Sequence, residues 1–370
     1  MEALVSFIIA AYNEEKFIVE CVESCLLQTY PSVEVVITDD GSTDETVSII
    51  RKKYLKEKRV KLISPSKKIG KAAAFNSSFA AAKGEFIALM GADDINYPER
   101  IATQITFLNS FDLVFCDLER VDSLNKSTIK KYMFGSGTMK IKEINFDSMI
   151  YSPIGNGSIL MNRKVAEKVF PLPTDLLHED YWIPLLSSFF GKISYFDKPL
   201  YKYRIHENNT SGIFNNQNKI KNIVISANRD YIYYKNVLQF FNEQNLFPFK
   251  FFIESKIFFL KPFSQNFMGD SFTLGAIKEH LESLKFEITN KKILFNHLIK
   301  QVYLFVLFRK WNFAKEILRK VEIFKDRNWI ELRVCVFFKI GNPEILKHSF
   351  FLRKGISLIC KLALSKYGTN

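Results

Sequence analysis

Apolar strand-type segments alternate with helix-type segments over the first 117 residues, and this alternation constrains the fold more than any other feature of the sequence. The expected strands are residues 4–10, 33–38, 60–64, 85–90 and 112–117. Helical spacing is found in residues 14–28, 70–83 and 98–109, and a further helix is expected after the turn "DDGSTDET". Because consecutive strand–helix–strand units form right-handed crossovers in one sheet, the pattern predicts an α/β fold with a mostly parallel central sheet.

Pairs of acidic residues follow two of these strands. Asp39 and Asp40 come after the second strand, and Asp93 and Asp94 after the fourth. Ligands of parallel sheets collect at the carboxyl ends of the strands. Asp40 can accept a hydrogen bond from a base N–H, although a capped turn explains it equally well. For Asp93 and Asp94, helix capping explains one acid, but the pair favours a divalent cation with substrate phosphates, because hard cations prefer oxygen ligands.

Four other short motifs carry side chains suited to a nucleotide or to acid–base chemistry. "AAYNEE" places Tyr12 where its ring can stack on a base, and "IGKAAAFN" places Lys71 near an anion. "LLHEDYW" sets acids beside aromatic residues, where a raised pKa suits a general base. "YKYRIHENNTSG" offers Arg204 and His206 as an anion binder and a metal ligand. Each motif alone is also compatible with an ordinary loop or helix start.

Taken in order, these motifs resemble the family 2 glycosyltransferases with the GT-A fold, over roughly residues 4–212. The resemblance implies an inverting transfer from a nucleotide-sugar, most often UDP-linked, to a hydroxyl of a glycan or lipid-linked acceptor. It also implies a hexosyl- or N-acetylhexosaminyl-transferase of cell-surface polysaccharide synthesis, such as lipopolysaccharide or capsule, with Mn²⁺ or Mg²⁺ as cofactor.

The resemblance assigns site residues position by position. It makes Asp180 the catalytic base, and Glu179 and Trp182 acceptor-binding residues. Arg204 and His206 would bind the diphosphate, and Asp94 and His206 the metal. The donor-binding residues would be Ala10, Tyr12, Glu14, Asp40, Gly41, Lys71, Asn76, Asp93 and Asp94.

Three positions depart from the family pattern. Gly91 stands where many members carry the first acid of an Asp-x-Asp triplet, so we expect Asp94 to bind the metal and Asp93 to turn to the ribose or the outer shell. Ala10 stands where the family often has proline. Phe75 stands where it often has arginine, which would move a phosphate contact to Lys71.

The charge distribution divides the chain into two expected domains. Residues 1–214 form the expected GT-A domain, with a nucleotide-sugar half (about 1–117) and an acceptor half (about 118–214). Residues 215–370 carry 26 Lys and Arg against 12 Asp and Glu, a net charge of +14, and are rich in Phe and Tyr with helical spacing. We expect a basic helical domain that binds an anionic membrane surface, a partner or a second copy, or that simply packs on the first domain. Nucleic acid ranks last, because no recognition motif is present.

Five scattered cysteines predict no disulfide framework, and the apolar runs are too short for a signal peptide or a membrane span. The expected location is therefore cytoplasmic, with attachment to the inner face of the membrane as a further option. Two other functions remain open at this point. A nucleotidyltransferase would show a glycine-rich phosphate loop near the first strand, where "AAYNEE" stands. A catalytically degenerate nucleotide-sugar-binding module is favoured by Gly91 and opposed by Asp180.

Overall fold

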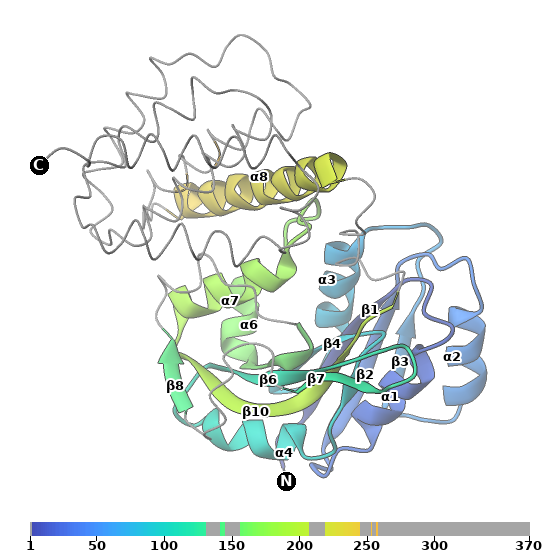
Figure 1. Cartoon of the computed structure of the whole chain (residues 1–370). Helices are drawn as coiled ribbons and strands as arrows, with labels where there is room; N and C mark the ends of the chain where they lie inside the picture. The colour runs from blue at the N-terminus through green and yellow to red at the C-terminus, as the bar shows by residue number, and fades with distance from the viewer. Residues whose placement is uncertain are drawn as a thin grey trace, which may run out of the picture. The chain divides into compact units, whose positions relative to one another are not determined.

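A computed structural model of the 370-residue chain describes residues 2–130, 141–144, 156–206 and 219–244, together with Ile253 and Ile257. The described strands belong to one sheet (Figure 1). Their bounds are β1 Val5–Ala11, β2 Val33–Asp39, β3 Val60–Ile63, β4 Phe86–Gly91, β5 Ile95–Asn96, β6 Leu113–Val121, β7 Ser127–Lys130, β8 Ile141–Ile144, β9 Ile159–Asn162 and β10 Ile193–Arg204.

The sheet is mostly parallel, as the sequence predicts. Its strand order is β3-β2-β1-β4-β9-β6-β10-β5, with β7 paired to β6 and β8 to β10. The four strands at the β3 end run parallel, and so do β6 and β10. Strand β9 runs antiparallel to both of its neighbours, β4 and β6, and joins the two parallel parts. This mixed α/β sheet confirms the expected fold class.

Helices cover both faces of the parallel part (Figure 1). Helices α1 (Ile18–Leu26) and α2 (Thr46–Tyr54) share one core with alternate residues of β1 and β2. Helix α3 (Lys71–Ala81) lies on the other face, where small buried residues let it approach the sheet closely. There Ser78 Oγ donates to the Ile9 carbonyl at 3.0 Å. Short α4 (Arg100–Gln104) and the 3-10 turn Ile105–Phe107 complete the expected fourth helix.

The strand register brings three loops to one level. Ala11 of β1 pairs with Asp39 of β2, and Ala10 pairs with Gly91 of β4. The chain leaves all three strands at the same edge of the sheet. The motifs after β1, β2 and β4 are therefore neighbours in space, as the parallel arrangement requires.

The second half of the domain adds the helices that carry the expected base. Helices α6 (Arg163–Val169) and α7 (Glu179–Phe190) follow β9, and α8 (Lys219–Glu243) follows β10. The chain divides into two compact units, Met1–Val237 and Leu238–Asn370, so the division falls inside α8. The rest of the expected basic helical domain, with Cys335 and Cys360, lies outside the described residues, apart from Ile253 and Ile257. Within the described part of the chain, no helix is both long and apolar enough to span a bilayer.

Candidate active site

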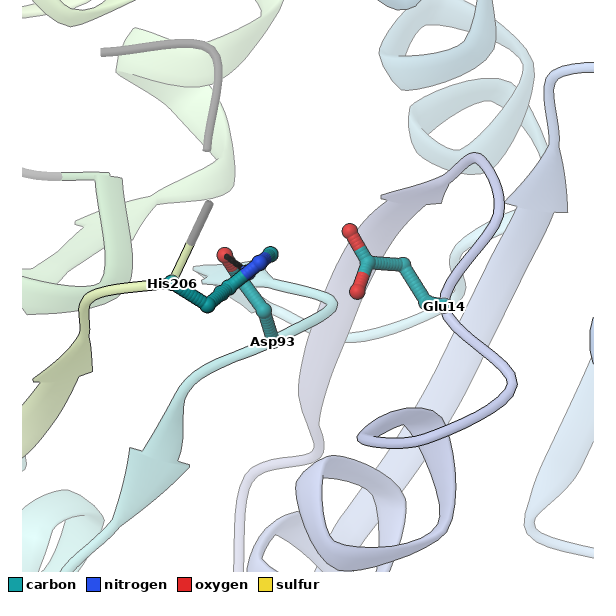
Figure 2. A group of neighbouring side chains, drawn as sticks. All are labelled: Glu14, Asp93 and His206. Carbon is teal, nitrogen blue, oxygen red and sulfur yellow. Dashed lines mark hydrogen bonds and ion pairs between the residues drawn. The ribbon is translucent and has the colours of Figure 1, made fainter. Parts of the chain in front are cut away.

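Three side chains from distant parts of the sequence meet at the carboxyl edge of the sheet. Glu14 follows β1, Asp93 follows β4 and His206 follows β10, and their ligating atoms all lie within 4.8 Å of one another (Figure 2). His206 Nε2 lies 3.1 Å from Asp93 Oδ2. Two carboxylates and an imidazole form a donor set that suits a divalent cation. An open hollow adjoins His206 and is lined by Asn13, Glu15, Lys16, Phe17, Asp44 and His206.

A backbone hydrogen bond holds Glu14 in the cluster, although its surroundings disfavour the charged form of its carboxylate. Its N–H donates to Thr46 Oγ1 at 2.8 Å, which ties the loop after β1 to the start of α2. Its Oε2 atom is buried and accepts no hydrogen bond. Burial, with the negative charges of Asp93 and Asp44, raises the pKa of Glu14 to about 8. A cation between Glu14 and Asp93 would remove this repulsion.

Asp94, expected as the metal ligand, lies apart from this cluster in the structure. It is 4% exposed, and its Oδ1 accepts from the Arg204 backbone N–H at 2.9 Å. A Cβ atom at Gly91 would lie 2.6 Å from Asp94 Oδ2, and one at Gly157 would lie 3.4 Å from it. Burial and the charge of Asp93 raise the pKa of Asp94 well above its usual range. The missing side chain at position 91 thus provides the space that the Asp94 carboxylate fills.

Arg204, expected at the diphosphate, has its guanidinium inside the protein. The side chain is 2% exposed, and its Nε donates to the Asp93 carbonyl at 2.8 Å. Its two terminal nitrogens donate to the Ser123 carbonyl at 3.1 Å and to Glu20 at 2.5 Å. The ring of Phe17 lies 4.7 Å from the guanidinium carbon. In this structure Arg204 therefore fixes the loop that carries Asp93 and Asp94.

The residues expected to bind the nucleotide base, Tyr12 and Asp40, contact the segment 68–70 that precedes α3. Tyr12 is 41% exposed, and Lys68 Nζ lies 3.3 Å from the centroid of its ring. Asp40 Oδ1 accepts from the backbone N–H groups of Ile69 and Gly70 at 2.8 and 2.6 Å. Gly41 has φ 76°, and a Cβ there would lie 3.0 Å from the Lys68 nitrogen, so the segment packs directly on the glycine.

Lys71, at the start of α3, contacts the helix that carries the expected base, Asp180. Its ammonium forms an ion pair with Glu179, which is 3% exposed at the start of α7. The Lys71 side chain is half exposed; partial desolvation opposes its charged form, but Glu179, Asp180 and Asp93 outweigh this and raise its pKa above its ordinary value. Lys71 thus lies within the field of the acid cluster and of Asp180 together.

Three other expected site residues are placed as follows. Asn76 holds the Leu172 backbone, donating to its carbonyl at 2.8 Å and accepting from its N–H at 2.7 Å. Trp182 is 2% exposed, and its indole donates to the Val169 carbonyl at 3.3 Å. Ala10 lies in β1 beside Gly91. In this structure Trp182 fastens α7, which carries the expected base, to the rest of the fold, and Asn76 fastens the segment that precedes it.

A comparison with protein families and curated proteins identifies the family. The model described as "Glycosyl transferase family 2" matches residues 6–170. An Escherichia coli protein named UDP-Glc:alpha-D-GlcNAc-diphosphoundecaprenol beta-1,3-glucosyltransferase WfaP is 33% identical over 230 residues, which cover 61% of this chain and 84% of that protein. The chain belongs to the family 2 glycosyltransferases. It is therefore an enzyme that transfers a glycosyl group.

Another curated protein and a solved structure match over a similar length. A Haemophilus influenzae protein named "Uncharacterized glycosyltransferase" is 28% identical over 228 residues, covering 58% of this chain and 69% of that protein. Among solved structures, S. aureus TarS 1–349 in complex with UDP-GlcNAc has a TM-score of 0.49 at 21% identity and covers 65% of this chain and 73% of that one.

For two residues near this cluster, Glu14 and Lys68, the sequence did not predict the contacts that the structure shows. Glu14 was expected to contact the donor, yet it completes the cluster with Asp93 and His206. A sequence signal for it existed, because Glu14 follows β1 as Asp93 follows its neighbour β4. Lys68 lies over the Tyr12 ring, and nothing in the sequence indicates this contact between residues far apart in the chain.

Proposed function

We propose that this enzyme transfers a sugar from a UDP-sugar to a hydroxyl of a glycan or lipid-linked acceptor in the synthesis of a surface polysaccharide. The observation that carries the proposal is the cluster of Glu14, Asp93 and His206 at the carboxyl edge of the sheet, next to the surface loops that hold Tyr12 and Asp40. The E. coli relative, whose name gives UDP-Glc as donor and a diphosphoundecaprenol-linked sugar as acceptor, supports the same chemistry here.

We propose that the cluster holds Mn²⁺ or Mg²⁺. The donor set fits such an ion, because Glu14 Oε2 is buried without a hydrogen-bond partner and lies near two further ligating atoms. When bound, the cation would stabilise the charge that develops on the leaving diphosphate. In this proposal the metal ligands are Glu14, Asp93 and His206. Asp94 instead stabilises the loop through its hydrogen bond to the Arg204 amide.

The proposed reaction is a single displacement. Asp180 accepts the proton of the acceptor hydroxyl, the hydroxyl oxygen bonds to the anomeric carbon, and the bond from that carbon to the phosphate oxygen breaks with its electron pair going to UDP. Tyr12 stacks on the uracil ring. For this the Lys68 side chain, which lies over the Tyr12 ring, either moves aside or contacts the other face of the uracil. Lys71 lies near both sets of acids and supplies positive charge beside the phosphates.

Calorimetric titration with UDP, and with GDP as control, tests the donor and the metal together. We expect UDP to bind wild type at least about tenfold more tightly with Mn²⁺ than with EDTA, a difference that Asp93→Asn and Glu14→Gln remove. Asp94→Asn serves as the comparison, because Asp94 is not part of the proposed ligand set and its Oδ1 accepts from the Arg204 amide. Paramagnetic resonance of Mn²⁺ gives a readout without nucleotide. Equal UDP binding with and without metal would overturn the metal site, and no nucleotide binding would overturn the donor.

The same proposal places the enzyme in the cytoplasm, on the inner face of the cell membrane. It rests on the basic, aromatic composition of residues 215–370 and on a lipid-linked acceptor. Sedimentation with vesicles tests it: anionic vesicles should pellet the full chain, and neutral vesicles should not. Equal behaviour with both kinds of vesicle would contradict it.

A further inference from the structure

The histidine of the "HED" motif lies between two carboxylates. His178 immediately precedes α7, is 17% exposed, and has its Nδ1 3.8 Å from Asp180 Oδ1. Its other ring nitrogen, Nε2, lies 3.4 Å from Asp230 Oδ1, on α8. Both ring nitrogens therefore face an acid, and one of these acids is the proposed base.

The contact with α8 is made by one face of that helix. Asp230, Tyr233 and Asn236 are spaced three residues apart, so they lie on the same side of α8. The rings of Tyr233 and Tyr181 are 5.6 Å apart, and Asn236 Nδ2 donates to Asp175 Oδ1 at 2.9 Å. These residues belong to the first compact unit, which ends at Val237. Helix α8 thus packs on the segment that leads into the base.

The charges around His178 favour the imidazolium. Burial disfavours its charged form, but Asp180 and Asp230 outweigh this and raise the pKa of His178 to about 9. Among the described residues the Tyr181 ring also faces His178, with their ring centroids 5.2 Å apart, and Tyr181 in turn packs on Tyr233. The adjacent Glu179 pairs with Lys71 of α3. The two contacts, at 3.8 and 3.4 Å, are ion pairs and not hydrogen bonds, and an imidazolium between two carboxylates attracts both.

We propose that His178 is a positioning residue for the catalytic base, holding the Asp180 carboxylate toward the acceptor while Asp230 of α8 holds His178. The proposal rests on the proposed role of Asp180. Asp180 takes the acceptor proton, and His178 keeps its own protons throughout. Loss of the imidazolium leaves Asp180 chemically intact but free to rotate, and small misplacement of a reacting group is enough to cost about 10²-fold in rate.

A titration that needs no activity tests the clamp directly. In the full chain with ¹³C-labelled histidine, His178→Gln identifies the signal of His178 among the five histidines. We expect its midpoint near pH 9 in wild type, against an ordinary value of 6.5. Asp230→Asn should lower the midpoint by about one unit or more, because it removes one of the two acids. Asn236→Ala is the matched control on the same helix face and should leave the midpoint unchanged. A wild-type midpoint near 6.5, or no shift in Asp230→Asn, overturns the proposal.

Steady-state transfer from a UDP-sugar tests the consequence for catalysis. His178→Gln should lower kcat about 10–100-fold with the donor KM unchanged, since it alters orientation and leaves the donor site intact. Asp230→Asn should move the alkaline limb of the kcat profile to lower pH, in step with the titration, and Asn236→Ala should not. Unchanged kcat in His178→Gln, or an alkaline limb of the kcat profile that does not shift with the His178 midpoint, overturns the positioning role. If wild type transfers no sugar from any UDP-sugar, the proposed function fails, while the titration still decides the clamp.

Discussion

Replacement of Gly91 by alanine tests the explanation that the structure gives for the missing acid of the triplet. An added Cβ would lie 2.6 Å from Asp94 Oδ2 and 3.0 Å from Asp93 Oδ1. Asp94 has little freedom to retreat, because it is 4% exposed and its Oδ1 is bonded to the Arg204 amide. The methyl group must therefore displace a buried carboxylate or the loop that holds it.

The expected cost follows from overpacking of a buried position. Such changes lower the free energy of unfolding by about 1–3 kcal/mol. For a cooperative unit of this size, each kcal/mol corresponds to about 2–4 °C in Tm. Urea denaturation followed by circular dichroism, with EDTA present to remove bound metal, measures the cost. Gly91→Asp should cost more than Gly91→Ala, because it adds a third carboxylate beside Asp93 and Asp94.

A double-mutant cycle provides the control. Asp94→Ala alone leaves the Arg204 amide without its acceptor and should also destabilise the fold. In Gly91→Ala/Asp94→Ala the collision is gone, so the combined cost should be smaller than the sum of the single costs. Strictly additive costs, or a Gly91→Ala protein as stable as wild type, would refute the packing explanation. The absence of an acid at position 91 would then have no structural cause in the packing of Asp94.

Two further predictions concern the support of α7. Asn76→Ala removes both hydrogen bonds to the Leu172 backbone and should cost about 1–3 kcal/mol in urea denaturation, whereas Asn76→Asp, which keeps one acceptor, should cost less. Unchanged midpoints in both would contradict this. Lys71→Met leaves the buried Glu179 without its cation, at a cost of about 1–3 kcal/mol that Glu179→Gln in the same chain should largely restore. Equal instability of the single and double variants would reject the ion pair as the cause.

The parallel strands β1, β2 and β4 and the helices between them were predictable, because short continuous segments of sequence determine them. The apolar runs at β1, β2 and β4 end where the sequence predicts, and the parallel pairing that the helices enforce brings their loops together. The placement of Asp93 at the carboxyl edge follows from that pairing alone. Strand β9 is different: its four residues carry no pattern of their own, and its two partners are set by sheet contacts distant in sequence.

Side-chain roles were less predictable, because partners far apart in sequence decide them. An arginine in a polar loop suggests an anion contact, yet Arg204 is buried by two carbonyls and Glu20, which satisfy a guanidinium equally well. Of two adjacent acids, the sequence does not show which one turns inward. The Arg204 amide and the space at Gly91 decide it, and both depend on the position of β10.

The "HED" motif shows how one short segment serves several parts of the fold. Successive residues at the start of a helix point about 100° apart, so three neighbours face three directions. Glu179 reaches Lys71 at the start of α3, beside the donor loops, and His178 reaches Asp230 on α8. Asp180 directly follows these two attached residues. If both fix the start of α7, the base is oriented relative to the donor loops on one side and α8 on the other, so a variant at either attachment should alter kcat without removing the base itself.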